Sequence, residues 1–312
     1  MLKFDKLKLV TGINYISDID TNIFLTQSKG DNVLYYKYHQ TTPFSLIIQA
    51  DVNKDELSIE FTGKILMDDY PNLINHTNIR KCFDTINAMG ICRLDVDRIL
   101  ELSDVVKCDV TQDVRLPLQE VTQIKQHLTN FDKWGSTKYE RDGLVIANKA
   151  KTPKYKKRLS IYDKTKELDK ATNKEFLRLL YDKQALLDQL KDKTRFEINI
   201  VTKEQIRKLL NIQDCKLSSV LYSDANPILT VFDEAINLNG TTINHTNKKD
   251  YMLELVIKDC DYDLEKVEAK IRSLTPKTTS IKREMQPFRE LYGRIQNNCF
   301  QKSVRDLLIQ ED

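Results

Sequence analysis

Alternation of apolar and polar residues with a period of two is the feature that most constrains this chain, because successive side chains on a strand point to opposite faces of a sheet. In the first third, the pattern runs through LKFDKLKLV, VLYYKYH, PFSLIIQADV and LSIEFTGKIL, with turn-forming residues such as KGDN between them. It returns in ICRLDVDRI, RLSIYDK and TRFEINI. These segments predict a sheet built from antiparallel strands.

Helical spacing appears between these strands and dominates the end of the chain. Helices are predicted from Thr77 to a stop at Gly90, near Leu116 to Leu128, and from about Thr165 to Leu190. Beyond Val201 the predicted helices are EQIRKLL, PILTVFDEAINL, 263–273 and 281–296. We therefore expect an α+β fold with an antiparallel central sheet, flanking helices and a mainly helical C-terminal accessory region. The expected domains are 1–201 and 202–312.

Composition narrows the class of protein. With 312 residues, 40% of them hydrophobic, the chain is long enough for a sizeable globular core. The 49 Lys and Arg nearly balance the 46 Asp and Glu, so the net charge alone does not indicate an anionic partner. A site for anions must therefore come from a local group of basic residues. Six scattered cysteines without a C-x-x-C pair favour reduced thiols over disulfides or zinc. No apolar run approaches the roughly 20 residues that a membrane span needs. We expect a soluble, intracellular protein without a membrane partner.

Three of the predicted strands combine an apolar face with a polar one. The polar faces hold Arg93, Asp95 and Asp97 in the first strand, Ser160, Tyr162 and Lys164 in the second, and Arg195, Glu197 and Asn199 in the third. If the apolar faces share one core, the polar faces gather on the other side of the sheet. Glu167 follows the second strand where the chain turns into a helix, and it is predicted to bend back toward Tyr162.

This concentration of polar groups has two interpretations. Carboxylates without histidine or cysteine suit Mg²⁺ or Mn²⁺, which prefer oxygen ligands and serve phosphoryl chemistry. A tyrosine beside such a metal is a candidate nucleophile, and Lys164 is a candidate either to hold a phosphate oxygen or to offset the charge of a developing phenolate. The alternative is an ordinary solvated face of an antiparallel sheet, on which tyrosine is a favoured residue.

The order of these segments resembles a known family, the rolling-circle replication initiators of the filamentous-phage gene II type, which are related to trans-acting plasmid initiators. ICRLDVD is similar to the family's S-R-I-D strand, RLSIYDKTKEL to its Y-x-K-x-x-E strand, and TRFEINI to its R-F-E strand. FTGKIL is similar, more weakly, to an upstream block of related initiators. The resemblance spans roughly residues 60 to 210.

The resemblance implies an enzyme that nicks and rejoins DNA. It places Tyr162 at the nucleophile, Lys164 at the family lysine, and Asp95, Glu167 and Glu197 at carboxylates that bind metal or act as acid and base. Asp97 matches no fixed family position and is kept as a further candidate metal ligand. Many rolling-circle initiators carry a histidine-hydrophobic-histidine motif, but His39, His76, His127 and His245 are isolated here, which favours the gene II branch.

Two basic segments are candidate DNA contacts. The loop NKAKTPKYKKR directly precedes the Tyr162 strand, and its lysines suit phosphates while its tyrosine suits an unpaired base. The predicted DNA-binding residues are Lys149, Lys151, Lys154, Tyr155, Lys156, Lys157, Arg158 and Arg195. A solvated loop is the alternative. The segment SIKREMQPFRELYGR at 280–294 reads either as a DNA-binding helix or as an ordinary amphipathic helix.

These features together predict a rolling-circle replication initiator in the cytoplasm of a bacterial host. Its expected partners are single-stranded or extruded origin DNA and a host helicase. Tyr162 is expected to form a 5′-phosphotyrosyl intermediate and to leave a free 3′-hydroxyl. The alternatives are a non-enzymatic origin-binding or regulatory protein and a metal nuclease that uses water. Whether Tyr139, Tyr155 or water ends the cycle is left open, as is the oligomeric state.

Overall fold

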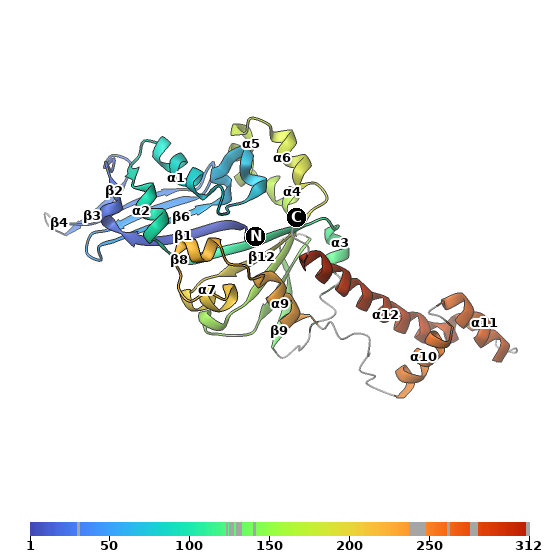
Figure 1. Ribbon diagram of the computed structural model, residues 1–312. Coiled ribbons are helices and arrows are strands. Elements are labelled where there is room, and N and C mark those ends of the chain that lie inside the picture. Colours follow the sequence, from blue (N-terminus) through green and yellow to red (C-terminus); the bar gives the residue numbers. More distant parts are fainter. Residues whose placement is uncertain are drawn as a thin grey trace.

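The computed structural model has an α+β fold, as the sequence predicts, built on a large antiparallel sheet (Figure 1). It describes residues 1–29, 32–122, 124, 128, 133–139, 142–236, 248–260, 263–274 and 280–309. Part of the predicted helix near 116–128 lies outside the described residues. His127 and His245 also lie outside them.

Ten strands form the main sheet in the order β3-β4-β5-β6-β1-β8-β12-β11-β10-β9. Their bounds are β1 (Phe4–Gly12), β3 (Leu25–Lys29), β4 (Asn32–Gln40), β5 (Leu46–Asp51), β6 (Glu56–Thr62), β8 (Asp104–Val114), β9 (Trp134–Tyr139), β10 (Gly143–Asn148), β11 (Arg158–Asp163) and β12 (Thr194–Ile200). Two short strands, β2 (Ile16–Ser17) and β7 (Arg93–Leu94), pair separately.

Helices cover the sheet on both sides and continue to the end of the chain. The α-helices are α1 (Ile79–Ala88), α2 (Val96–Leu102), α3 (Leu118–Val121), α4 (Lys164–Leu168), α5 (Lys174–Leu179), α6 (Lys183–Leu190), α7 (Lys203–Leu210), α8 (Leu217–Leu221), α9 (Pro227–Ala235), α10 (Lys248–Asp259), α11 (Leu264–Leu274) and α12 (Ile281–Ile309). Short 3₁₀ segments are η1 (Ile13–Tyr15), η2 (Gly63–Asn72), η4 (Pro153–Tyr155) and η5 (Ala171–Asn173).

The apolar face of the sheet forms the main core. Alternate residues such as Leu7, Phe61 and Ile198 point to this face and pack with buried residues of α1, α2 and α7 to α9. A second apolar cluster lies on the opposite face of the sheet. There η2 packs with α4, α5 and α6 through Tyr70, Phe176 and neighbouring leucines. The polar face of the central strands is therefore covered by protein.

The C-terminal region divides into two parts. Helices α7, α8 and α9 pack on the sheet and contribute to its core, so this core continues past the expected boundary at residue 201. Helices α10, α11 and the first part of α12 have a separate core that includes Ile257, Val267 and Phe288. The end of α12 returns to the sheet, where Val304 and Leu308 are buried. Figure 1 shows the three-helix unit projecting from the body of the molecule.

Most of the predicted strands and helices are confirmed, but two predictions are wrong. ICRLDVDRI is not a central strand: β7 contains two residues, and α2 begins directly after Asp95. The Asp95 side chain accepts a hydrogen bond from the backbone N–H of Arg98, which is the geometry of a helix N-cap. The single helix expected over 165–190 is broken into α4, α5 and α6, and Asp182 caps the last of these.

Two further predictions concern cysteines and membranes. Cys82, Cys92, Cys108, Cys215 and Cys260 are buried free thiols. In the part of the chain that the structure describes, none of the helices combines the length and apolarity that crossing a bilayer would require.

Candidate active site

Three neighbouring strands supply the polar face around Tyr162, and β8 takes the place that was predicted for ICRLDVDRI. Pairing across β8, β12 and β11 aligns Asp113, Arg195 and Tyr162 in one row. The next row holds Thr111, Glu197 and Ser160, and in the third row Asp109 lies opposite Asn199. The predicted faces of RLSIYDK and TRFEINI are confirmed, since Leu159, Ile161, Phe196 and Ile198 are buried in the apolar core.

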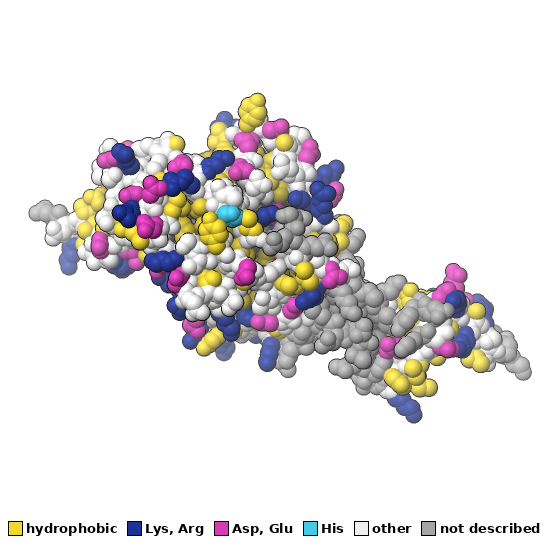
Figure 2. All heavy atoms as spheres, in the orientation of Figure 1, with side chains coloured by type: hydrophobic (Ala, Val, Ile, Leu, Met, Phe, Trp, Pro, Cys, Tyr) yellow, Lys and Arg dark blue, Asp and Glu magenta, His cyan; other side chains and the backbone are white. Residues whose placement is uncertain are grey.

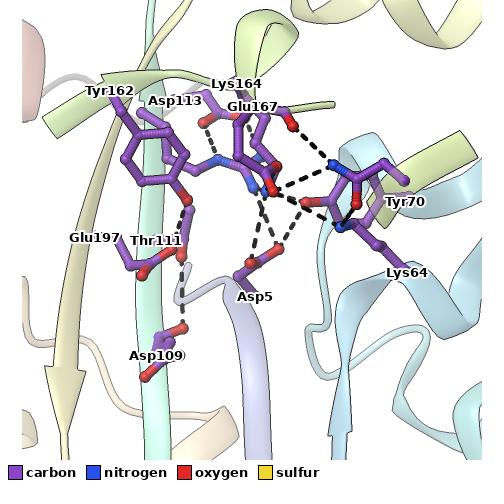
Figure 3. A network of polar contacts seen from close by, with 12 residues as sticks. Asp5, Lys64, Tyr70, Asp109, Thr111, Asp113, Tyr162, Lys164, Glu167 and Glu197 are labelled. Carbon is purple, nitrogen blue, oxygen red and sulfur yellow. Dashed lines mark hydrogen bonds and ion pairs between the residues drawn. The ribbon is translucent and has the colours of Figure 1, made fainter. Parts of the chain in front are cut away.

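Tyr162 lies inside the protein with its hydroxyl on a carboxylate. The Tyr162 hydroxyl donates to Oε2 of Glu197 over 2.8 Å, as Figure 3 shows. The residue is 5% exposed, and its ring stacks on Tyr139 with 4.9 Å between the ring centroids. Burial, followed by the negative charge of Glu197, raises the pKa of Tyr162 well above its ordinary value. The phenol therefore needs a base before it can act as a nucleophile.

Glu197 has the properties of such a base. Burial, together with the negative charges of Asp5 and Asp109, raises the pKa of Glu197 to about 7. Burial also raises the pKa of Asp109, which accepts a hydrogen bond from Asn199. A carboxylate with a pKa near neutrality is suited to exchange a proton with a hydrogen-bonded partner.

The end of β11 positions a buried cation beside this pair. Asp163 caps α4 by accepting from the backbone N–H of Lys166, so the chain turns and brings Lys164 and Glu167 together. Nζ of Lys164 lies 2.7 Å from Oε2 of Glu167 and 5.6 Å from the centre of the Tyr162 ring. Burial opposes the charge of Lys164, but Asp5 and the other acidic groups raise its pKa above the ordinary value. Lys164, 3% exposed, therefore remains protonated.

Arg195 is fully buried, and all three nitrogens of its guanidinium donate hydrogen bonds. Nε and Nη2 donate to the two carboxylate oxygens of Asp113 over 2.7 and 2.8 Å. Nη1 donates to Asp5 over 3.2 Å and to the hydroxyl of Tyr70 over 3.0 Å. Arg195 was predicted to contact DNA, and this prediction is wrong because the side chain is 0% exposed.

Several members of this network were missed from the sequence. Asp5 comes from β1, Lys64 and Tyr70 come from η2, and Asp109 and Asp113 come from β8. Nζ of Lys64 lies 2.6 Å from Oδ1 of Asn173 and 3.9 Å from Glu167. The segment DVVKCDVTQDV at 104–114 is rich in β-branched residues, a strand signal that would have found the β8 residues.

A cavity of about 540 Å³ opens beside Tyr162. Its lining combines aromatic, acidic and basic side chains, among them Tyr139, Tyr162, Asp142, Lys166, Glu167 and Lys170. Lys166 forms an ion pair of 2.7 Å with Asp142. The cavity is of a size that admits a small ligand or one unit of a polymer, and it borders the ring of Tyr162.

Asp95 and Asp97 do not belong to this site, which corrects their predicted role. Asp95 is the exposed cap of α2, and Asp97 in the first turn is 83% exposed and pairs with Arg80. Both residues lie outside the main sheet: Asp95 follows β7, which pairs with β2, and Asp97 lies in α2. Sequence parity placed them on the polar face only because ICRLDVDRI was assigned to the central sheet.

The remaining carboxylates do not form the metal site that the resemblance implies. Glu167 already faces Lys164 and Lys64, and Glu197 accepts the phenol hydrogen of Tyr162. Within the residues that the structure describes, no three carboxylate, histidine or cysteine side chains converge as ligands of a cation. The predicted set of Asp95, Asp97, Glu167 and Glu197 thus does not fit one Mg²⁺ or Mn²⁺ ion.

The predicted basic loop connects β10 to β11 and includes η4. Lys149, Lys151, Lys154, Tyr155, Lys156 and Arg158 are exposed, and Lys157 is half-buried. Tyr155 is 55% exposed and lies under Nζ of Lys154 at 4.8 Å. Lys154 and Lys157 pair with Glu204 and Glu234. Figure 2 shows basic and acidic side chains interspersed on the viewed face.

Comparison with known proteins adds no family assignment. No protein-family model matches the chain, and no curated protein matches its sequence.

Proposed function

We propose that the protein nicks and rejoins DNA through Tyr162, and that it acts as a rolling-circle replication initiator. The observation that carries this proposal is the 2.8 Å hydrogen bond from the Tyr162 hydroxyl to Glu197, beside the protonated Lys164. A nucleophile, a base whose pKa is about 7 and a nearby cation are the groups that phosphoryl transfer to a phenol requires.

In the proposed reaction the phenol proton moves to Glu197 as the Tyr162 oxygen attacks the phosphorus of a phosphodiester. A phosphorus–oxygen bond forms at Tyr162 and the bond to the 3′-oxygen breaks. The 3′-oxygen takes a proton from solvent, so the products are a 5′-phosphotyrosyl ester and a free 3′-hydroxyl. Rejoining reverses these steps. Because the ester conserves the energy of the cleaved bond, rejoining needs no nucleotide.

Lys164 has a separate task in this scheme. Its ammonium lies 5.6 Å from the centre of the Tyr162 ring and favours the phenolate that forms during attack. DNA would reach the site through the cavity that the Tyr162 ring borders. The basic loop precedes Arg158, at the end of β11 opposite to Tyr162, so its lysines would hold phosphates of the bound single strand at a distance from the reacting phosphate.

The biological setting is proposed on the resemblance of the sequence alone. It comprises single-stranded or extruded origin DNA as substrate, a host helicase as partner and the bacterial cytoplasm as compartment. A requirement for Mg²⁺ or Mn²⁺ is part of the same expectation. The predicted ligands do not fit such an ion, so the proposed reaction uses only the protein's own groups, and adduct formation with and without a chelator tests the metal requirement.

The burial of Tyr162 favours a second candidate, a DNA-binding protein without catalytic activity. In that case the network around Arg195 and Lys164 only stabilises the fold, and the exposed basic loop binds DNA. Such a protein would retain DNA in a complex that denaturant dissociates, whereas a nickase would retain part of it covalently.

Covalent trapping distinguishes the two candidates without knowledge of the origin sequence. The protein is incubated with a random-sequence library of single-stranded oligonucleotides, and DNA that stays attached in denaturing detergent is amplified and sequenced. The nickase proposal predicts that wild-type protein enriches a shared sequence and that Tyr162→Phe enriches none. Equal recovery with Tyr162→Phe would remove Tyr162 from the role of nucleophile.

A further inference from the structure

Asp5 reaches the Tyr162 site through an irregularity in β1. The register between β1 and β8 shifts between Phe4 and Lys6, which marks Asp5 as the extra residue of a β-bulge. The bulge explains why Phe4 and Leu7, three positions apart, are both buried in the apolar core, although strict alternation would send them to opposite faces. It also directs Asp5 to the polar face.

The carboxylate of Asp5 joins two cations that otherwise have different partners. Oδ1 accepts from Nη1 of Arg195 over 3.2 Å and from the Tyr70 hydroxyl over 2.8 Å. Oδ2 lies 3.8 Å from Nζ of Lys164. Asp113 binds Arg195, and Glu167 binds Lys164 and Lys64. Asp5 is thus the carboxylate that links the Arg195 side of the network to the Lys164 side (Figure 3).

The charges explain why such a link is needed. Arg195, Lys164 and Lys64 are positive groups whose mutual repulsion is felt in a largely buried region. Burial opposes the ionisation of Asp5, yet the charges of Lys164 and Arg195 lower its pKa to about 2. Asp5 is therefore a permanent anion between these cations, and without it Lys164 would keep the carboxylate of Glu167 but lose that of Asp5.

We propose that Asp5 is a positioning residue of the Tyr162 site: its carboxylate ties the Lys164 ammonium to the Arg195 guanidinium and so fixes Lys164 beside the Tyr162 ring without contacting DNA. This inference rests on the proposed function for its kinetic test, but a spectroscopic test is independent of activity.

The kinetic test compares Asp5→Asn with wild type on an oligonucleotide recovered by covalent trapping. Removal of the charge at nearly constant shape is expected to slow adduct formation at saturating DNA roughly 10- to 100-fold, as for other misplaced catalytic groups. The DNA concentration for half-maximal rate should change less than about twofold, since Asp5 does not touch DNA. A rate at saturation equal to that of wild type would overturn the proposal.

The spectroscopic test follows the ionisation of Glu197 by ¹³C NMR of side-chain carboxyls, with the signal assigned by its loss in Glu197→Gln. Glu197 is influenced by Asp5, Asp109, Lys164 and Tyr162. Removal of the Asp5 charge should move the midpoint of the Glu197 signal to lower pH, and the acid limb of the rate profile should follow it. Spectra of the same samples also follow Lys164 itself: its ammonium lies over the Tyr162 ring at 5.6 Å, so the signals of its terminal methylene carry the ring current of Tyr162 and should shift in Asp5→Asn. Unshifted Lys164 signals would overturn the proposal even if no adduct forms.

Glu60→Gln is the matched control. Glu60 is likewise a partly buried carboxylate of this sheet, and it pairs with Lys6, Lys8 and Lys107 outside the Tyr162 site. It should change neither the rate nor the midpoint. If Asp5→Asn does not fold, Tyr70→Phe removes the 2.8 Å donor to Asp5 and should also slow adduct formation at saturation. An unchanged rate in folded Tyr70→Phe would then contradict the proposal.

Discussion

Replacing Arg195 by methionine should destabilise the fold strongly. Methionine fills a similar volume but donates no hydrogen bond, so Asp113 loses two bonds of 2.7 and 2.8 Å, and Asp5 loses one of 3.2 Å. Both carboxylates would stay in the protein without this counter-charge. Breaking a buried ion pair in this way costs about 3–5 kcal/mol. Arg195→Lys should lose less stability, because lysine keeps the positive charge. It should still lose some, because lysine lacks the planar set of guanidinium N–H donors.

The assay is unfolding in guanidinium chloride, with the midpoint and the slope recorded for each variant. Arg195→Met should lower the midpoint without changing the slope, since the surface exposed on unfolding stays the same. The control is Arg178→Met, which breaks the exposed pair with Glu175 and should leave the midpoint in place. A midpoint for Arg195→Met equal to that of wild type would refute the assignment of Arg195 as the centre of the buried network.

Three further predictions follow from individual groups. Glu197 binds its proton more tightly in the folded protein, because its pKa there is about 7 against an ordinary 4.5. The free energy of unfolding should therefore fall by about 3 kcal/mol as the pH rises from 4.5 to 7. Glu197→Gln should abolish this fall, and a fall that persists in the variant would show that another group causes it. Asp97→Asn should alter neither stability nor adduct formation, because Asp97 is exposed and outside the site; loss of the adduct would return Asp97 to the candidate ligands. Replacing Lys151 and Lys156 by glutamine should make the plot of log K for single-strand binding against log salt concentration less steep, by about 0.7 in slope for each lost phosphate contact. An unchanged slope would exclude the loop as a phosphate contact.

The sequence predicted the parts of the site that depend on local periodicity. Alternation in RLSIYDK and TRFEINI placed Tyr162, Lys164 and Glu197 on one polar face, and the structure joins these residues directly or through one neighbour. The turn after β11 was also expected, and it brings Glu167 to within 2.7 Å of Lys164. Because side chains alternate along a strand, the face on which a residue lies can be predicted without knowing which strand is its neighbour.

The rest depended on information that periodicity does not contain. ICRLDVDRI fits a strand by parity, yet Val96 and Ile99 also fit the buried face of a helix, and the Asp95 cap decides for the helix. The role of Asp5 depends on a bulge that interrupts the alternation between Phe4 and Leu7, and this interruption does not reveal which side chains of other strands and helices Asp5 then meets. Tyr162 is covered by the ring of Tyr139 from β9 and by Lys164 at the start of α4, and these contacts join separate segments of the chain.

The covalent link itself is the most direct test of the account. Wild-type protein carrying trapped DNA is digested with nuclease and trypsin, and the tryptic peptide Leu159–Lys164 is examined by tandem mass spectrometry. We expect a nucleotide attached through its 5′-phosphate to Tyr162, with Glu197→Gln giving much less of it near neutral pH. A nucleotide on another residue, or an adduct of undiminished amount in Tyr162→Phe, would contradict the assignment of Tyr162 as the nucleophile.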